Sequence, residues 1–337
     1  MKGVKVAIVG ATGMVGQEFI KVLGQRSFPM DSIRLFASDR SAGRRLQVKN
    51  DEVEVEETSP NSFEGVDIAL FSAGAEISHH FSPIAARAGA VVIDNSAAFR
   101  MDPQVPLVVP EINAEDIKQH KGIIANPNCS TIQMVVALYP LHRVNPIKRI
   151  IVSTYQSVSG TGSAAIEELS EQAKLVLAGR TAMPHVYPHQ IAFNLLPEID
   201  VFLDNGYTKE EWKMVEETRK IMHAPEIAVS ATCVRVPVFI GHSEAVHVEF
   251  SEPMPVDTAR RILAQAPGVK VLDDPTVSLY PQPWSVAGSD DVFVGRIRQD
   301  ASLSCGLAMW VVADNVRKGA ALNAVQIAET MIKMGWI

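Results

Sequence analysis

A glycine-rich turn directly after the first apolar run constrains the fold most strongly. Residues 4–10 read Val-Lys-Val-Ala-Ile-Val-Gly, a β-branched run typical of a buried parallel strand. Glycines recur at Gly10, Gly13 and Gly16, and the amphipathic stretch 17–23 predicts a helix. In such a unit the first glycine permits the tight turn, the second admits a pyrophosphate, and the third lets the helix approach the strand. A turn that binds no ligand stays open as the alternative, because the spacing is not the commoner G-x-G-x-x-G.

The alternation of strands and helices continues to about residue 127. We expect strands at 33–37, 66–71 and 91–94 and a helix at 77–88. This order predicts an α/β fold, a Rossmann-type doubly wound parallel sheet with ligands at the carboxyl ends of its strands.

From about Lys148 the pattern changes to long strand runs, which predicts a second, α+β domain with a mixed sheet. We expect the first domain to comprise 1–127 with the C-terminal segment 315–337, and the second to comprise 128–314. The expected strands are 150–157, 228–236, 244–251, 292–299 and 304–313; the expected helices are 163–177, 208–222 and 317–334, with a loop or arm over 179–196.

Composition excludes several classes of partner. The 337 residues carry a net charge of −7 with acids and bases interspersed, so there is no basic stripe for a nucleic acid. No apolar run reaches the length of a membrane span, and the start of the chain has no signal peptide pattern. Three sparse cysteines fit a reducing cytoplasm, and no metal-ligand spacing occurs. We expect a cytoplasmic protein without a metal, nucleic-acid or membrane partner.

Cys129 stands in the run Ala-Asn-Pro-Asn-Cys-Ser-Thr-Ile-Gln over 125–133. Pro127 ends the preceding strand, and the residues after Cys129 predict a helix start. A thiol at a helix N-terminus is stabilised as the thiolate, which is a nucleophile for carbonyl carbon. The alternative is a small buried hydrophobe, the common role of a free cysteine.

The end of the second strand distinguishes NAD from NADP. An acid there accepts a ribose hydroxyl, whereas cations and hydroxyls bind a 2′-phosphate. The sequence has Ser38, Asp39, Arg40 and Ser41 at this point. Arg40 and Ser41 favour NADP, whereas Asp39 leaves NAD as the alternative cofactor.

Several polar residues stand in apolar or turn contexts. On the residues alone, a solvated helix pair is the better interpretation of Glu210 and Lys213. An edge-strand charge is the alternative for Arg235, and a loop histidine for His242. The full set is Arg100, Gln156, Glu210, Lys213, Arg235 and His242.

Taken together, these motifs resemble the bacterial aspartate-semialdehyde dehydrogenases along nearly the whole chain. The nearest alternative family, the N-acetyl-glutamyl-phosphate reductases, usually has Pro-Gly-Cys-Tyr at the thiol, where this chain has Pro-Asn-Cys-Ser. The matching segments are 10–16, 126–131, 156–160, 210–213, 235–238 with His242, and 313–323.

The resemblance implies a role for each matched residue. Cys129 would form a thioester, His242 would be the acid/base, and Gln156 would orient the substrate. Arg235 would bind the substrate carboxylate and Glu210 its ammonium. The phosphate and substrate would further be held by Arg100, Lys213 and Asn128. The cofactor would be held by Gly10, Thr12, Gly13, Met14, Val15, Arg40, Ser41, Ser159, Gly160 and Asn315.

The implied activity is the reversible, NADPH-dependent reductive dephosphorylation of L-aspartyl 4-phosphate to L-aspartate 4-semialdehyde. It would serve diaminopimelate, lysine, methionine, threonine and isoleucine biosynthesis, in a homodimer with a catalytic and dimerisation domain. Two alternatives remain: reduction of another acyl phosphate such as N-acetyl-glutamyl phosphate, and a non-catalytic NADP-binding sensor.

Overall fold

The computed structural model describes residues 3–337, and its contacts divide the chain into two compact units. Unit 1 is Met1–Asn128 with Ala320–Ile337, and unit 2 is Cys129–Gly319. The sequence predicted the second boundary between residues 314 and 315, whereas the structure has it between Gly319 and Ala320. Residues 315–319 therefore belong to unit 2. Each unit is described by itself.

Unit 1 contains a seven-stranded sheet in the order β3-β4-β2-β1-β5-β6-β7. All neighbouring pairs are parallel except β3 with β4, which confirms the doubly wound sheet. The strand order reverses direction between β1 and β5, the point where such sheets bind ligands. The strands are β1 (Val4–Val9), β2 (Met30–Ala37), β3 (Arg45–Val48), β4 (Asp51–Glu57), β5 (Ile68–Phe71), β6 (Val91–Asp94) and β7 (Ile123–Ala125).

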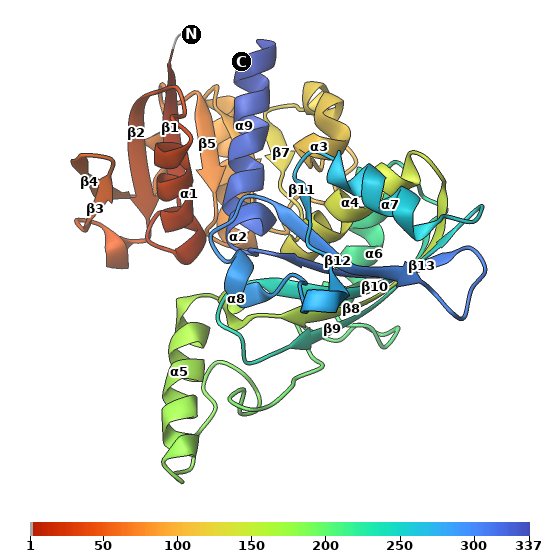
Figure 1. The fold of residues 1–337 in the computed structure, drawn as a ribbon. Coiled ribbons are helices and arrows are strands. Elements are labelled where there is room, and N and C mark those ends of the chain that lie inside the picture. Colours follow the sequence, from red (N-terminus) through yellow and green to blue (C-terminus); the bar gives the residue numbers. More distant parts are fainter. Residues whose placement is uncertain (1–2) are drawn as a thin grey trace. The chain divides into compact units, whose positions relative to one another are not determined.

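Helices cover both faces of this sheet (Figure 1). One face packs against α1 (Met14–Gln25) and α9 (Leu322–Met334), with Phe19 and Val325 fully buried between them and the strands. The other face packs against Phe63 and α2 (Ala75–Arg87). The short helical turns are α3 (Pro110–Asn113), η1 (Asp39–Ser41), η2 (Pro60–Phe63) and η3 (Ala114–Gln119).

The glycine turn has the geometry that its sequence predicts. Gly10 has φ 87°, and a Cβ on it would lie 2.3 Å from the carbonyl oxygen of Ser72, which follows β5. A Cβ on Gly16 would lie 2.2 Å from the Gly10 oxygen, so α1 packs directly on the turn. Side chains are therefore excluded at both positions.

Unit 2 contains a mixed six-stranded sheet in the order β11-β12-β13-β10-β8-β9, as expected for an α+β domain. The outer pairs β11–β12 and β8–β9 are parallel, and the central pairs are antiparallel. The strands are β8 (Ile147–Gln156), β9 (Ala228–Arg235), β10 (His242–Phe250), β11 (Val269–Val271), β12 (Val292–Gln299) and β13 (Gly306–Ala313).

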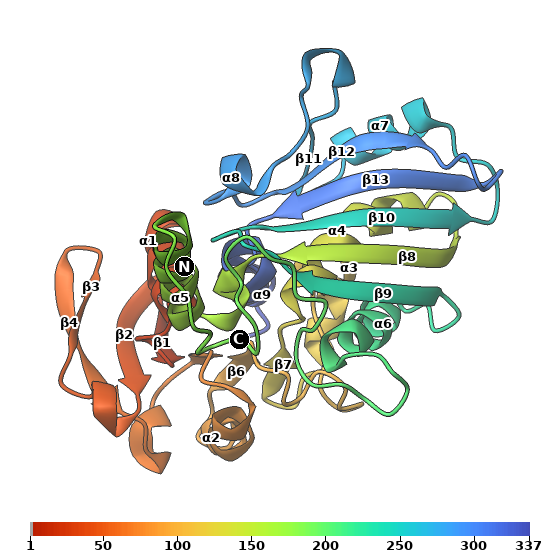
Figure 2. The ribbon, with the colours of Figure 1, turned by 90° about the horizontal axis from the view of Figure 1, so that it is seen from below.

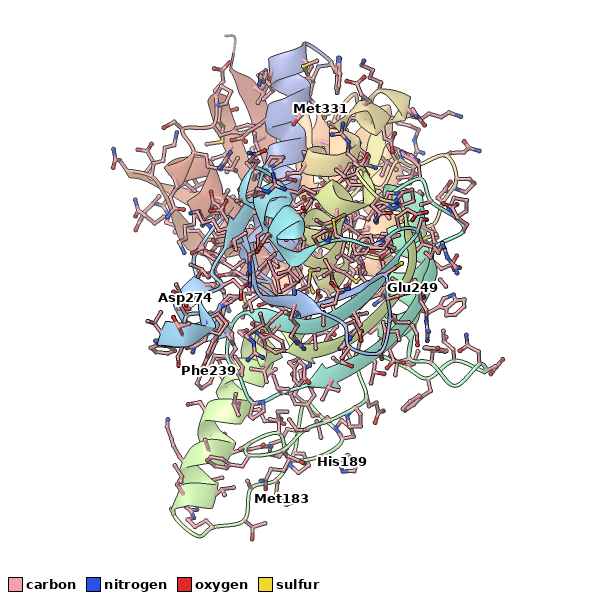
Figure 3. The ribbon with its side chains drawn as sticks, turned by 45° about the vertical axis from the view of Figure 1, so that its right-hand side comes forward. Met183, His189, Phe239, Glu249, Asp274 and Met331 are labelled. Carbon is pink, nitrogen blue, oxygen red and sulfur yellow. The ribbon has the colours of Figure 1, made fainter. Side chains whose placement is uncertain are left out.

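Three helices, α4 (Cys129–His142), α6 (Lys209–Ile221) and α7 (Val256–Ala264), pack on one face of this sheet (Figures 1 and 2). The helix α5 (Ser163–Leu177) leads into an irregular arm that carries Met183 and His189 (Figure 3). The remaining turns are η4 (Val158–Thr161), η5 (Pro275–Val277) and α8 (Pro283–Val286).

The expected helix 317–334 is wrong in its first turn. Residues Arg317–Ala321 form a π-helix, and α9 begins only at Leu322. Inserted π turns occur frequently at functional sites. Within residues 3–337, no helix is long and apolar enough to cross a membrane, and no cluster of three potential metal ligands occurs.

Candidate active site

Three predicted site residues meet because their strands end at one edge of the unit 2 sheet. Gln156 ends β8 and Arg235 ends β9, and the two residues are register partners in this parallel pair. His242 begins β10, which runs antiparallel to β8, so it starts where β8 ends. Asn315 follows β13 at the same edge, because His242 pairs with Ala313.

His242 is fully buried and uncharged at neutral pH. Burial, and then the nearby Arg235 guanidinium, lower the pKa of His242 to about 3. The backbone N–H of Ser157 donates to Nδ1 at 3.0 Å, and the Ser157 hydroxyl lies 3.0 Å from the same nitrogen. Since Nδ1 accepts a hydrogen bond, the neutral ring carries its hydrogen on Nε2. That N–H lies on the Gln156 side, 3.4 Å from the amide nitrogen.

The amide of Gln156 is held in one orientation. The buried Thr154 hydroxyl donates to Oε1 at 3.0 Å, and Nε2 donates to the Glu210 carboxylate at 3.1 Å. The nitrogen is therefore aimed toward His242 and Glu210. Sequence reasoning missed Thr154, whose alternation with Gln156 along β8 was the available signal.

Glu210 and Lys213 form a partly buried network in which Glu210 is buried, so their interpretation as a solvated pair is wrong. Glu210 is 6% exposed because α6 packs on β9. Lys213 Nζ lies 3.0 Å from Glu210 and 2.8 Å from Asp200. Burial alone would lower the pKa of Lys213, but these two carboxylates outweigh it and raise that pKa.

Arg235 presents an unpartnered donor. Its Nη1 donates to the Ser157 carbonyl oxygen at 2.7 Å, whereas the buried Nε has no hydrogen-bond partner in the described residues. A Cβ on Gly160 would lie 2.9 Å from Nη1 and 3.3 Å from His242 Nε2. Gly160 thus keeps open the space beside both side chains. A buried guanidinium with a spare N–H is suited to an anionic ligand.

Cys129 is the first residue of α4, at the helix start predicted from the sequence. Its side chain is partly exposed, whereas the next nine residues of the helix are buried. A Cβ on Gly319 of the π-helix would lie 2.8 Å from Cys129 Cβ. The thiol therefore lies at a helix N-terminus, with glycine backbone packed against it.

Ser159 and Asn315 are joined by hydrogen bonds next to His242. The Oδ1 of Asn315 accepts from the hydroxyls of Ser157 and Ser159, both at 3.1 Å, and from the Gly241 N–H at 2.9 Å. This network fixes the loops that flank His242. Ser159 and Asn315 came from the family resemblance, whereas Ser157 and Gly241 were not predicted as site residues.

In unit 1, Arg100 is anchored at the carboxyl ends of β6 and β7. Its Nε donates to the Asn126 carbonyl oxygen and its Nη2 to that of Asn95, both at 2.9 Å. Asn128 is buried and ends this part of unit 1.

The predicted cofactor turn in unit 1 brings two of the predicted residues together. The Thr12 hydroxyl of the glycine turn lies 3.4 Å from that of Ser41. Asp39 Oδ1 accepts from the Arg40 backbone N–H at 2.8 Å, a local hydrogen bond within η1. Met14 and Val15 begin α1 behind the turn.

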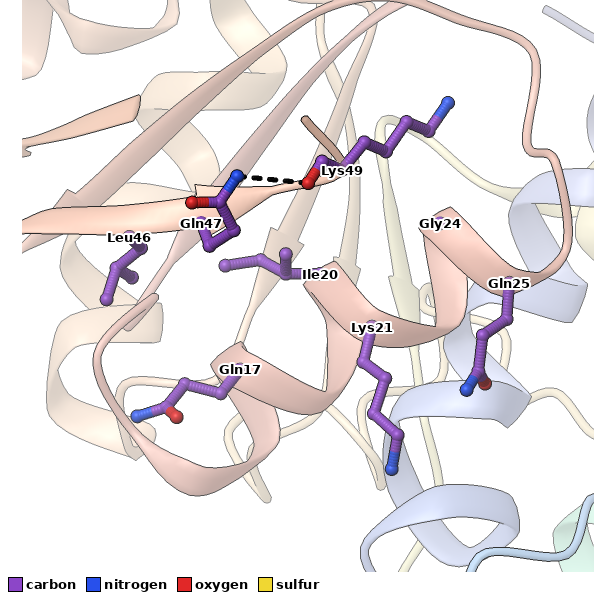
Figure 4. A pocket seen from close by; sticks show the side chains of 8 residues that line it. All are labelled: Gln17, Ile20, Lys21, Gly24, Gln25, Leu46, Gln47 and Lys49. Carbon is purple, nitrogen blue, oxygen red and sulfur yellow. Dashed lines mark hydrogen bonds between the residues drawn. The ribbon is translucent and has the colours of Figure 1, made fainter. Parts of the chain in front are cut away.

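A separate cavity of about 520 Å³ in unit 1 lies between α1 and the β3 hairpin (Figure 4). It is lined by Gln17, Lys21, Leu46 and Lys49 among others, and contains no predicted site residue. We assign no function to this cavity.

Family models match both parts of the chain. Residues 5–120 match the semialdehyde dehydrogenase NAD binding domain, and residues 138–318 match the semialdehyde dehydrogenase dimerisation domain. These matches agree with the predicted fold class.

Relatives match over the whole length. The aspartate-semialdehyde dehydrogenase of Aquifex aeolicus is 58% identical, covering 99% of this chain and 100% of the relative. That of Bacillus subtilis is 51% identical, covering 100% and 99%.

Solved structures of aspartate-semialdehyde dehydrogenases are also similar to this chain. The aspartate semialdehyde dehydrogenase II of Vibrio cholerae, complexed with ASA, has a TM-score of 0.96 at 50% identity over 99% of each chain. The Candida albicans enzyme with NADP has a TM-score of 0.79 at 28% identity, covering 99% and 100%. With this full-length identity and the matching fold, the chain belongs to the aspartate-semialdehyde dehydrogenase family.

Proposed function

We propose that this chain catalyses the reversible, NADPH-dependent reductive dephosphorylation of L-aspartyl 4-phosphate to L-aspartate 4-semialdehyde. The observation that carries the proposal is the buried, unpartnered Nε of Arg235 beside a neutral His242. An amino-acid substrate offers a carboxylate for this guanidinium and an ammonium for Glu210, which lies in the same network through Gln156.

The cofactor assignment is NADP(H). Gly10, Gly13 and the N-terminus of α1 provide the close backbone approach that a pyrophosphate needs, and Arg40, Ser41 and Thr12 suit a 2′-phosphate. When bound, this cofactor supplies the hydride. We assign Ser159, Gly160 and Asn315 of unit 2 to the same ligand by family resemblance.

Covalent chemistry is assigned to Cys129. Its thiolate attacks the acyl carbon of the substrate, the carbon–sulfur bond forms, and the phosphate leaves with its bonding electron pair. The proposed groups that offset the phosphate charge are Arg100 and Lys213, with Asn128 holding the substrate. After reduction of the thioester, the carbon–sulfur bond breaks, which releases the aldehyde and restores the thiolate.

Proton transfer is assigned to His242. In the free chain its Nε2–H faces the Gln156 amide nitrogen, so both donors are available to the oxygen of the thiohemiacetal. As the acid, the doubly protonated ring gives its Nε2 proton to that oxyanion and is left neutral. In the reverse direction a neutral ring whose hydrogen has moved from Nε2 to Nδ1 takes up the thiohemiacetal proton at Nε2, and inorganic phosphate then attacks the thioester.

Two alternatives are distinguishable by one assay. An N-acetylated glutamyl substrate has no ammonium, so the buried Glu210 would have no role in binding it. A non-catalytic sensor would bind NADP without turnover. Phosphate-dependent NADP reduction, measured with each aldehyde in turn, separates the three. We expect turnover with aspartate semialdehyde, and the absence of phosphate dependence would contradict the proposal.

We further propose a homodimer formed through unit 2. The sheet face away from α4 carries the exposed Ile151 and Tyr155, and an apolar groove of the same unit includes Phe239 and the 89% exposed Trp284. Light scattering of the purified chain measures its oligomeric state, and a monomer would contradict the proposed homodimer. Cys129, Cys233 and Cys305 form no disulfide, which agrees with the cytoplasm as the proposed location, and cell fractionation tests this.

A further inference from the structure

A buried acid that has no role in the proposed chemistry lies two residues from His242. Glu244 is 0% exposed and follows His242 on the same side of β10. Neither of its carboxyl oxygens has a hydrogen-bond partner in the described residues. A buried ionised carboxylate without a partner is costly, so the environment favours the neutral acid.

The group that acts on Glu244 from the facing helix is Gln133. Gln133 lies one turn after Cys129 in α4 and is also 0% exposed. Its Nε2 donates to the backbone oxygen of His242 at 3.4 Å, whereas its Oε1 has no partner. Burial raises the pKa of Glu244 well above its usual value, and the nearby Gln133 amide, which favours the ionised carboxylate, opposes this rise only in part, so the neutral acid prevails.

The unsatisfied atoms of Gln133 and neutral Glu244 are complementary. The amide of Gln133 uses its donor end on His242, so the end that remains is an acceptor. A neutral carboxyl has one O–H to donate. Because neutral Glu244 has a donor and Gln133 an acceptor, one hydrogen bond satisfies both buried groups.

We propose that the neutral carboxyl of Glu244 donates to Oε1 of Gln133, and that this bond fixes the start of α4, with Cys129, against the His242 end of β10. Glu244 is thus a positioning residue for the thioester chemistry, and this inference rests on the proposed function. The covalent step is sensitive to the placement of the reacting groups, since a misplacement of about 1 Å costs on the order of 100-fold in rate.

The test compares Glu244→Gln with Glu244→Leu in the full-length chain. Glu244→Gln keeps a neutral donor, so we expect kcat within about threefold of wild type and an unchanged pH profile of kcat. Glu244→Leu removes the donor, so we expect kcat to fall by about 10- to 100-fold with little change in the two KM values. The matched control is Glu249→Gln, at the far end of the same strand (Figure 3).

Further measurements distinguish a positioning role of Glu244 from a folding defect and from a failure of the proposed function. Glu244→Leu leaves the buried Oε1 of Gln133 without its donor, so its Tm should fall modestly, and kcat is therefore compared at a temperature well below the Tm of every variant. The rate of Cys129 alkylation by iodoacetamide should fall in parallel with kcat. If Glu244→Leu does not fold, Gln133→Leu replaces it, with the same expected loss of kcat.

The inference is overturned if Glu244→Leu keeps wild-type kcat and alkylation rate, or if Glu244→Gln is as slow as Glu244→Leu. If Glu244 acted as an ionised carboxylate instead, the pH profile of kcat would change in Glu244→Gln, and that result would also overturn the inference. Wild-type turnover of aspartate semialdehyde is measured first. Its absence would contradict the proposed function, whereas normal wild-type turnover with unaffected variants would contradict only the role of Glu244.

Discussion

Arg235 is expected to bind substrate rather than to take part in bond breaking, and Arg235→Lys tests this. Lysine keeps the charge but lacks the fork, so it cannot supply the second N–H that Nε now offers in a buried position. A hydrogen bond between charged groups contributes about 1.5–3 kcal/mol. At about 1.4 kcal/mol per factor of ten, the KM for the semialdehyde should rise about 10- to 100-fold.

The assay measures initial rates of NADP reduction while the semialdehyde and phosphate are varied in turn. In Arg235→Lys the phosphate KM should change much less than the semialdehyde KM. Lys213→Ala should show the opposite order, although its contact with Glu210 predicts a smaller effect on the semialdehyde as well. Arg261→Lys, an exposed change on α7, is the matched control. Equal effects on both KM values in both variants would refute two separate anion sites.

Further predictions concern the cofactor, the acid/base and the substrate space. Wild type should prefer NADP to NAD in kcat/KM, and Arg40→Ala should lose this preference; equal use of NAD by wild type would assign the ribose to Asp39. His242→Asn should lower kcat by about 10²–10⁴-fold with a smaller change in KM. Because the pKa of His242 falls from 6.5 to about 3 on folding, only the unfolded chain takes up its proton between these values. The free energy of unfolding should therefore decrease as pH falls through this window, and less steeply in His242→Asn, which urea titrations at several pH values measure. Gly160→Ala should lower kcat/KM about 10-fold or more, because the methyl group lies 2.9 Å from Arg235 Nη1 and the guanidinium must shift; wild-type kinetics would contradict this.

The sequence predicts the parts of the fold that depend on local pattern. The glycine turn, the doubly wound sheet and the helix start at Cys129 all follow from periodicity and backbone restrictions at glycine and proline. The hairpin of β3 and β4 escaped prediction because residues 51–57 are mostly acidic, so they hold too few apolar residues for the clear alternation that predicts a strand.

What the sequence does not reveal depends on packing between distant segments. Glu210 and Lys213 show a surface-like helix spacing, and only the packing of α6 on β9 makes them a partly buried network. Thr154 and Ser157 were given no role from the sequence, because each acts on a side chain that folding brings to it, and the burial of Glu244 likewise depends on packing. The π turn at 317–321 likewise has no signal in hydrophobic periodicity.

The central claim, a thioester on Cys129, is tested most directly without phosphate. The enzyme is mixed with aspartate semialdehyde and NADP, NADPH is followed by rapid mixing, and the quenched protein is analysed by mass spectrometry. We predict a burst of about one NADPH per active chain and an aspartyl group on the peptide containing Cys129, both lost in Cys129→Ser and kept in Cys305→Ala. Absence of the burst in wild type, or an aspartyl group on Cys233 or Cys305 instead, would contradict the account.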